Sequence, residues 1–204
     1  MAKTPVADRA SPTLWEEAAS YADSGESDRP RRERLAAIRA GRQVAERCVA
    51  QHPTMAACYY YRAVLTGLHY QLTVIGYQKG LARMLADCQR VVTLEPAFAE
   101  AGAYRIMGQI YTQIPETAFR PGSLTRDLDR AIGYLQQAVA LAPEAFENHL
   151  ALCEAQVAAA AWQDGARSCA MAARLVRHKR GAAQYAEWRE ALRVLKKRLA
   201  KRNQ

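Results

Sequence analysis

The sequence predicts an all-α protein, and three observations support that fold class. Half of the 204 residues are apolar but only 8% are aromatic, and Ala and Leu are abundant, which favours helices over strands. Gly and Pro gather between stretches in which apolar residues recur every three or four positions. Pro53, Pro96 and Pro143 each follow such a stretch, 43 and 47 residues apart, which indicates a repeated helical unit.

The first helix of the unit is clearest in the middle of the chain. The spacing Tyr104-x2-Met107-Gly108-x2-Tyr111 matches the first helix of a tetratricopeptide unit. The standard unit has about 34 residues, so each of the two periods contains an insertion of roughly ten. We therefore expect a tetratricopeptide-like helical repeat, arranged as a solenoid or bundle.

The second helix of the unit is clearest in the stretch from Gly122 to Ala155. Ala131 and Ala138 are small enough to let this helix approach its partner closely, and Leu135 is expected to fill the seam between them. Pro143 ends the helix because its ring nitrogen carries no hydrogen for the helical hydrogen-bond ladder.

The remaining elements follow from the same periodicity. We expect a disordered N-terminus at residues 1–11 and one domain at residues 12–204, with a polar linker at 22–30 and a Pro/Gly-rich insertion at 114–127. The final helix has one apolar and one basic face, and should cap the open end of the stack. The expected helices, about nine in number, are residues 12–21, 31–51, 54–70, 77–94, 97–113, 128–141, 144–161, 164–177 and 182–201.

The charge pattern bears on the kind of partner. The formal net charge is +9, and much of the excess lies at residues 28–34 and in the last thirty residues. Aromatic residues do not interleave with the terminal run, as a nucleic-acid stacking platform would require, so no nucleic-acid partner is expected. The basic segments are either solvated helix faces or a patch for an acidic partner or anionic lipid.

The sequence offers no pattern typical of catalysis. The four histidines are scattered, no Gly-rich phosphate loop follows a strand, and no Cys-x2-Cys or zinc-type His pairing occurs. We therefore expect no enzyme activity, no metal and no cofactor. No apolar run approaches the ~20 residues of a membrane span. The start of the chain lacks the apolar core of a signal peptide, so the protein is either cytoplasmic or the mature part of an exported chain.

Residues 77–175 carry a resemblance to a known family. The segments GAYRIMGQIYTQIP and GSLTRDLDRAIGYLQQAVALAPEAFENHLALCEA resemble the T-component of TRAP transporters, and the chain is also similar to helical components of bacterial sterol and lipid transport systems. The resemblance implies a non-enzymatic periplasmic protein, of a group that is often lipid-anchored, that works with a solute-binding or transporter protein. Peripheral association with the outer membrane is expected on the same ground. The resemblance also implies apolar or organic-acid ligands. The chain has no lipobox cysteine, and its first ~75 residues do not match the family.

Candidate ligand-binding residues come from the concave wall that first helices form in a tetratricopeptide stack. This wall is largely apolar with a few polar groups, which suits a small molecule. Arg105 would bind a ligand carboxylate or hydroxyl, or else pair with a carboxylate of the protein. Phe119, in the long insertion, is either a gate or part of a loop plug. The candidate residues are Tyr61, Val64, Leu68, Tyr104, Arg105, Gln109, Tyr111, Phe119, His149 and Leu152.

Two further groups leave alternatives open. Five tyrosines either line a lipid cavity or belong to the core and its rim: Tyr59, Tyr60, Tyr61, Tyr70 and Tyr77. Cys48 and Cys58 lie symmetrically about Pro53, and Cys153 and Cys169 about Ala161, so each pair faces across a helical hairpin. These pairs are either disulfides, which would favour an oxidising compartment, or buried free thiols.

From these observations we expect a protein that holds a hydrophobic small molecule, lipid or sterol-like, in a cavity between helices and exchanges it with periplasmic transport proteins. The alternative is a tetratricopeptide scaffold that binds a partner's peptide in its concave groove. A closed apolar cavity of ~300 Å³ or more would favour the carrier, whereas an open polar groove would favour the scaffold.

Overall fold

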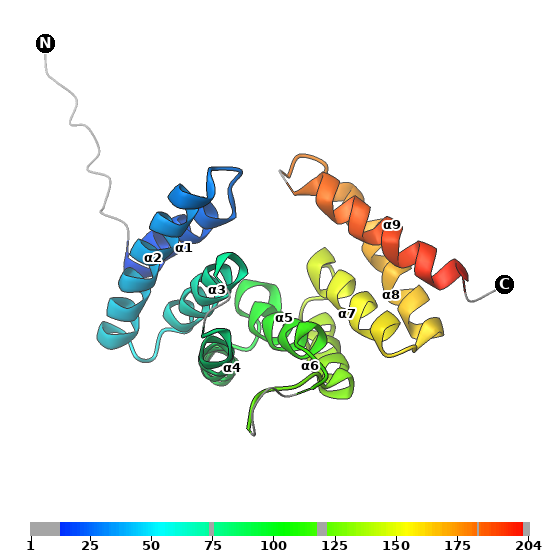
Figure 1. Cartoon of the computed structure of the whole chain (residues 1–204), viewed down its shortest axis with the longest axis horizontal. Helices are drawn as coiled ribbons and strands as arrows, with labels where there is room; N and C mark the ends of the chain where they lie inside the picture. Colours follow the sequence, from blue (N-terminus) through cyan, green and yellow to red (C-terminus); the bar gives the residue numbers. More distant parts are fainter. Residues whose placement is uncertain (1–12, 74–75, 118–121, 183, 202–204) are drawn as a thin grey trace, which may run out of the picture.

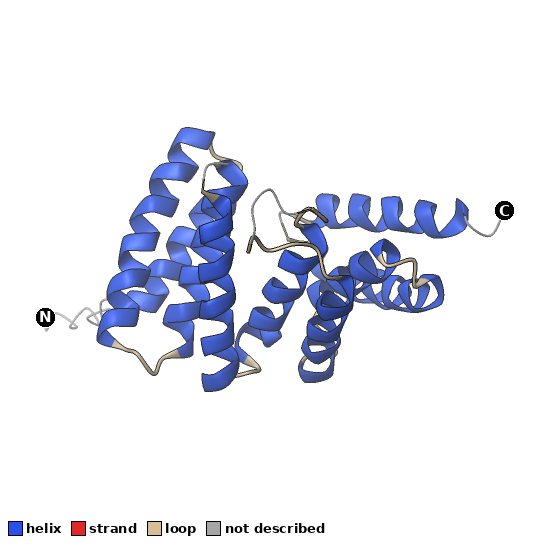
Figure 2. Ribbon diagram, turned by 60° about the horizontal axis from the view of Figure 1, so that its bottom comes forward, coloured by secondary structure: helices blue, strands red, loops and turns tan. Residues whose placement is uncertain are grey.

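The computed structural model describes residues 13–73, 76–117, 122–182 and 184–201, and over these residues it contains helices and no strand (Figure 2). The described residues form nine α-helices, which confirms the all-α fold. The helices are α1 (Leu14–Glu26), α2 (Arg31–Gln51), α3 (Ala56–Leu72), α4 (Tyr77–Leu94), α5 (Phe98–Gln113), α6 (Leu128–Leu141), α7 (Phe146–Ala158), α8 (Trp162–Leu175), the 3-10 helix η1 (Val176–Lys179) and α9 (Tyr185–Lys201).

The helices pack in consecutive hairpins, α1 with α2, α3 with α4, α5 with α6 and α7 with α8, and α9 follows the last pair. The first helices α3, α5 and α7 also contact one another in sequence, as tetratricopeptide-like repeats require. In Figure 1 the molecule is an open arc, with α1 and α2 in one arm, α8 and α9 in the other, and α3 to α7 between them.

The helix ends follow from local chemistry. The helices α2, α4 and α6 end two residues before Pro53, Pro96 and Pro143, as the sequence predicts. At the start of α1, Thr13 and Glu16 form a capping box, with the Thr13 backbone N–H donating to the Glu16 carboxylate at 2.8 Å.

The seam between α5 and α6 is tight because it is built from small residues. Leu135 is fully buried and lies against Gly108, where an added Cβ would stand only 2.4 Å from the Leu135 Cγ. Ala131 and Ala138 are also fully buried on the same side of α6. The expected role of these residues is therefore confirmed.

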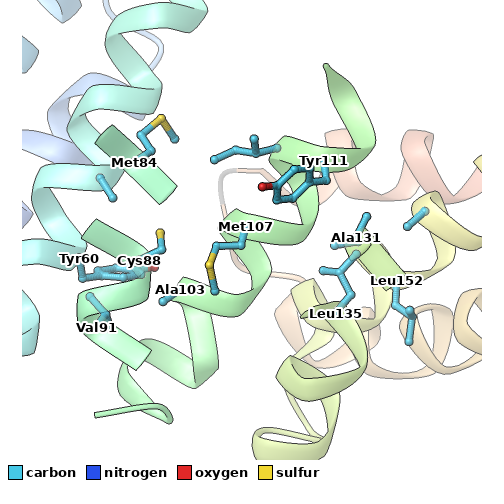
Figure 3. Close-up of a cluster of buried hydrophobic side chains, with 14 of the residues drawn as sticks. Tyr60, Met84, Cys88, Val91, Ala103, Met107, Tyr111, Ala131, Leu135 and Leu152 are labelled. Atoms are coloured by element: carbon cyan, nitrogen blue, oxygen red, sulfur yellow. The ribbon is translucent and has the colours of Figure 1, made fainter. Parts of the chain in front are cut away.

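The core has three parts. The central cluster runs from α3 to α7, and Figure 3 shows Met84 and Tyr60 on one side of Met107 and Leu135 and Leu152 on the other. A second cluster joins α1, α2 and α3. The third joins α7, α8 and α9, where the rings of Phe146 and Trp188 lie 5.0 Å apart. Through this last contact α9 covers the end of the stack.

A partly buried ion-pair network joins the first two hairpins. Arg62 of α3 donates through Nη2 to Asp87 of α4 at 2.5 Å, and Asp87 is only 3% exposed. The same guanidinium donates through Nη1 to Glu46 of α2 at 2.9 Å, and Arg83 of α4 also pairs with Glu46. The network fixes the angle between these helices, because a charge this buried is stable only with its partners in place.

The structure corrects two boundaries. Helix α1 continues to Glu26, through part of the expected polar linker, because Ala22 and Gly25 are buried and Gly25 lies against Ile38 of α2. Helix α7 ends at Ala158 rather than near 161, and Ala160 follows with a left-handed φ of 56°. The expected disorder at 1–11 concerns residues outside the described part of the chain.

Candidate functional site

A groove of about 690 Å³ lies between α3, α4 and α5 and is partly open to solvent. Most of its lining is apolar or aromatic, and its polar side-chain groups are one cation, one carboxylate, three amides and three tyrosine hydroxyls. The lining residues are Glu26, Tyr60, Val64, Gly67, Leu68, Tyr70, Gln71, Tyr77, Leu81, Met84, Arg105, Ile106, Gln109, Ile110, Gln113, Ile114 and Pro115.

The groove has two chemically different walls because of helical periodicity. On α3, Val64 and Leu68 are four residues apart and therefore lie on one face, which makes an apolar wall. On α5, Arg105, Gln109 and Gln113 follow the same spacing and make a polar stripe about 12 Å long. A ligand with one apolar side and one polar edge would match both walls.

Two tyrosine rings at the groove are held against glycines. A Cβ added at Gly80 of α4 would stand 1.9 Å from the Tyr70 ring, and one added at Gly102 of α5 would stand 2.6 Å from the Tyr60 hydroxyl. Each ring therefore lies directly on a helix backbone. Burial raises the pKa of the Tyr60 hydroxyl, whereas the nearby Arg105 lowers it.

The end of the groove is formed by the insertion that precedes α6. Ile114 and Pro115 line the groove, and the Pro115 carbonyl accepts a hydrogen bond from the Arg126 backbone at 2.9 Å. Gln78, in the first turn of α4, accepts from the Leu124 backbone N–H at 3.1 Å. The described parts of the insertion therefore dock back onto α4 and α5.

Arg105 is held in place at the other end by a fully buried amide. Its Nη1 donates to Oδ1 of Asn148 in α7 at 2.7 Å. The Nδ2 of Asn148 in turn donates to the carbonyl oxygens of Glu100 and Ala138, both at 3.0 Å. The remaining N–H groups of the Arg105 guanidinium have no hydrogen-bond partner among the described residues.

Glu26 of α1 stands at the rim beside Arg105. Although its side chain is exposed, the surrounding protein raises the pKa of its carboxyl, Asp23 raises that pKa further, and Arg34 and Arg105 lower it. The rim thus carries one charge of each sign, and the cation is the more rigidly held of the two.

The structure brings together four of the candidate ligand-binding residues, namely Val64, Leu68, Arg105 and Gln109. Three of the five clustered tyrosines, Tyr60, Tyr70 and Tyr77, also line the groove. The candidate Phe119 falls outside the described residues.

The other five candidates do not line the groove. The ring of Tyr61 stacks on Trp15 with centroids 6.2 Å apart. The rings of Tyr104 and Tyr111 pack on Tyr134 at 6.4 and 6.1 Å instead. Leu152 is part of the central core.

The fifth of these candidates, His149, is buried on α7. Its Nε2 lies 2.8 Å from the Pro143 carbonyl oxygen. Pro143 lies in the turn between α6 and α7, so this contact ties the His149 side chain to the packing of these two helices rather than to the groove.

Sequence reasoning missed most of the contribution of α4, because it took the wall from first helices and considered only Tyr77 of α4, as one of the clustered tyrosines. Leu81 and Met84 of this second helix also line the groove. The strong amphipathic pattern of α4 was the signal in the sequence that an apolar face of this helix would also contribute to the wall. Glu26 was missed because its segment was expected to be a linker.

Both cysteine pairs form disulfides in the structure. Cys48 joins α2 to Cys58 of α3, and Cys153 joins α7 to Cys169 of α8, with Cα atoms 5.4 and 5.1 Å apart. Cys88 is a buried free thiol, and burial raises its pKa.

Among the described residues, no group of three His, Cys, Asp or Glu side chains is arranged to hold a metal ion. In the same part of the chain, no helix is long and apolar enough to cross a bilayer. No protein-family model matches the sequence, and no curated protein matches it significantly.

Proposed function

We propose that the protein is a non-enzymatic carrier that holds a hydrophobic small molecule, lipid or sterol-like, in the groove between α3, α4 and α5. The observation that carries this proposal is the groove itself, about 690 Å³ of mostly apolar surface with one fixed guanidinium at its rim. Sites for small molecules typically measure about 300–1,000 Å³ and combine apolar walls with a few orienting groups.

The ligand's orientation follows from the two walls. Its apolar body would lie against Val64, Leu68 and Met84, where burial contributes about 25 cal/mol per Å² of apolar surface. Its carboxylate or hydroxyl would accept hydrogen bonds from Arg105, which Asn148 holds in position. Because the orientation is prepared in advance, little ordering of the protein opposes binding.

The biological setting is proposed on two grounds. The resemblance to the T-component of TRAP transporters supports exchange of the ligand with a periplasmic solute-binding or transporter protein. The two disulfides support an oxidising compartment such as the periplasm over the cytoplasm. Association with the outer membrane belongs to the same proposal.

A second candidate function is a scaffold that binds an extended peptide in the same groove. The open side of the groove favours it, as does the polar stripe of Arg105, Gln109 and Gln113, whose amides suit the polar groups of a peptide backbone. The volume and the predominance of apolar lining favour the carrier.

Native mass spectrometry of the purified chain, followed by organic extraction, tests the carrier. The expected result is a mass above that of the chain alone. Organic extraction should return the protein to the mass of the chain and release an apolar compound. Gln109→Trp should obstruct the middle of the groove and strongly reduce the fraction of chains that carry the added mass, whereas Gln136→Trp, on the exposed face of α6, should leave that fraction unchanged. A chain mass without any addition, together with binding of extended peptides that Gln109→Trp blocks, would support the scaffold instead.

A further inference from the structure

The net positive charge of this protein arises from its C-terminal end, residues 174–204. Residues 1–173 contain 18 Lys and Arg and 18 Asp and Glu, so they carry no formal net charge. Residues 174–204 contain 11 Lys and Arg and only 2 Asp and Glu, which accounts for the whole net charge of +9. Because the rest of the chain carries no formal net charge, the electric field of the protein attracts anions mainly to its C-terminal end.

The fold collects this charge along a groove between α8, η1 and α9, which we call the basic groove. One hollow of about 400 Å³ is lined by Ala173, Val176, Arg177, Arg180, Tyr185, Arg189, Leu192, Arg193 and Lys196. A neighbouring hollow of about 360 Å³ shares Arg177 and Lys196 and adds Arg174. No carboxylate is among the described residues that line either hollow.

Most of these cations are available to an external partner. Arg193 pairs with Glu190 at 2.5 Å, and Arg189 lies over the Tyr185 ring at 5.9 Å. Arg177, Arg180 and Lys196 are exposed and have no ion-pair partner among the described residues. Because cations gathered in this way repel one another, an anion placed between them is strongly favoured.

We propose that the basic groove docks the protein onto the phosphate headgroups of an anionic lipid bilayer. Each hollow has room for a phosphate group, and guanidinium groups bind phosphate oxygens through paired hydrogen bonds. Residues 1–173 carry no formal net charge, so a negatively charged membrane surface attracts the C-terminal end of the protein and orients it toward the bilayer. This proposal does not depend on what the α3–α4–α5 groove binds.

The attachment is electrostatic, and α9 does not insert into the bilayer. Leu192 and Leu195 are buried against α7 and α8, and Trp188 packs on Phe146. The apolar face of α9 is therefore already used within the protein. The same packing removes Trp188 from the stacking role that single-stranded nucleic acid requires.

Vesicle sedimentation of the full chain provides the test, with phosphatidylcholine vesicles and vesicles that also contain about 30% phosphatidylglycerol. The expected result is binding to the anionic vesicles alone at about 50 mM salt, with loss at about 500 mM salt. The variant Arg177→Gln/Arg180→Gln/Lys196→Gln should weaken this partitioning on the order of 100-fold, since each cation near the surface contributes separately.

The matched control is Arg29→Gln/Arg32→Gln/Lys79→Gln, which removes the same charge from exposed positions elsewhere. It should bind anionic vesicles nearly as well as the unmodified chain, and circular dichroism should show both variants folded. Equal weakening by the two variants, or no binding of the unmodified chain to anionic vesicles, would overturn the proposal. Tighter binding to single-stranded RNA than to anionic vesicles, lost in the groove variant, would overturn it in favour of a nucleic-acid partner.

Discussion

Arg105 and Asn148 lie on neighbouring first helices, and Nη1 of the arginine donates to Oδ1 of the asparagine at 2.7 Å. Asn148 is fully buried, and its Nδ2 also donates to carbonyl oxygens of Glu100 and Ala138. One amide therefore connects α5, α6 and α7 and aims a cation at the rim of the groove. This contact couples the stability of the central repeat to the polar end of the candidate site.

Asn148→Ala should lower the free energy of unfolding by about 2–4 kcal/mol, because it removes the hydrogen bonds to the Glu100 and Ala138 carbonyl oxygens, leaves Arg105 without its buried acceptor and creates a small cavity. Urea unfolding followed by circular dichroism measures the change. Gln136→Ala, exposed on α6, is the control and should alter stability by less than about 0.5 kcal/mol. A loss at Asn148 no larger than the control's would contradict the role assigned to this amide.

Gly108→Ala should destabilise the protein by about 1–3 kcal/mol, because the new Cβ would stand 2.4 Å from the fully buried Leu135. Gly133→Ala is a matched control, since its Cβ would meet nothing within 4 Å and alanine favours the helix. It should raise stability by about 0.5–1 kcal/mol. The stabilities of the two variants, measured by thermal and urea unfolding, should thus change in opposite directions. A change in the same direction would refute the close packing at Gly108.

Glu154→Gln should increase the free energy of unfolding at pH 7. Burial raises the pKa of the Glu154 carboxyl in the folded protein, so the ionised form is less stable there than in the unfolded chain. The gain should shrink as the pH falls through the folded-state pKa and vanish below the unfolded value of about 4.3. Urea unfolding between pH 3 and 8 measures it, with the exposed Glu144→Gln as control. A gain that does not depend on pH would contradict this explanation.

Thiol titration in denaturant should find one reactive thiol per chain without reductant, from Cys88, and five after reduction. Removing either bridge with a Cys→Ser pair should lower stability by about 3 kcal/mol, because the released loop gains entropy in the unfolded chain. The Cys88→Ser variant should leave the unreduced count at zero. Five thiols without reductant, in protein exported to the periplasm, would show that the bridges do not form.

The sequence was sufficient for the architecture because proline and small residues act locally. Each of Pro53, Pro96 and Pro143 follows the end of a helix. The absence of a side chain at Gly108 allows α6 to approach α5 closely. The cysteine pairs could be matched for the same reason, since equal distances from a turn bring two side chains opposite each other in a hairpin.

The site was predicted only in part because it depends on how far neighbouring hairpins separate. The spacing rule grouped Val64, Leu68, Arg105 and Gln109 on one wall, and these four residues line the groove. It could not show that Tyr104 and Tyr111 would turn toward Tyr134, because that contact depends on a ring on the next helix. The buried partner of Arg105 lies 43 residues away in the sequence, and periodicity carries no information about such a contact.

The distribution of the disulfides has a consequence for how the arc deforms. One covalent link joins α2 to α3 and the other joins α7 to α8, whereas no such link restrains α4, α5 and α6 in the described chain. Bending of the molecule should therefore concentrate among α4, α5 and α6, as hinge motions fall where restraints are fewest. Binding of a bulky ligand in the groove between α3, α4 and α5 would then be coupled to the curvature of the whole arc.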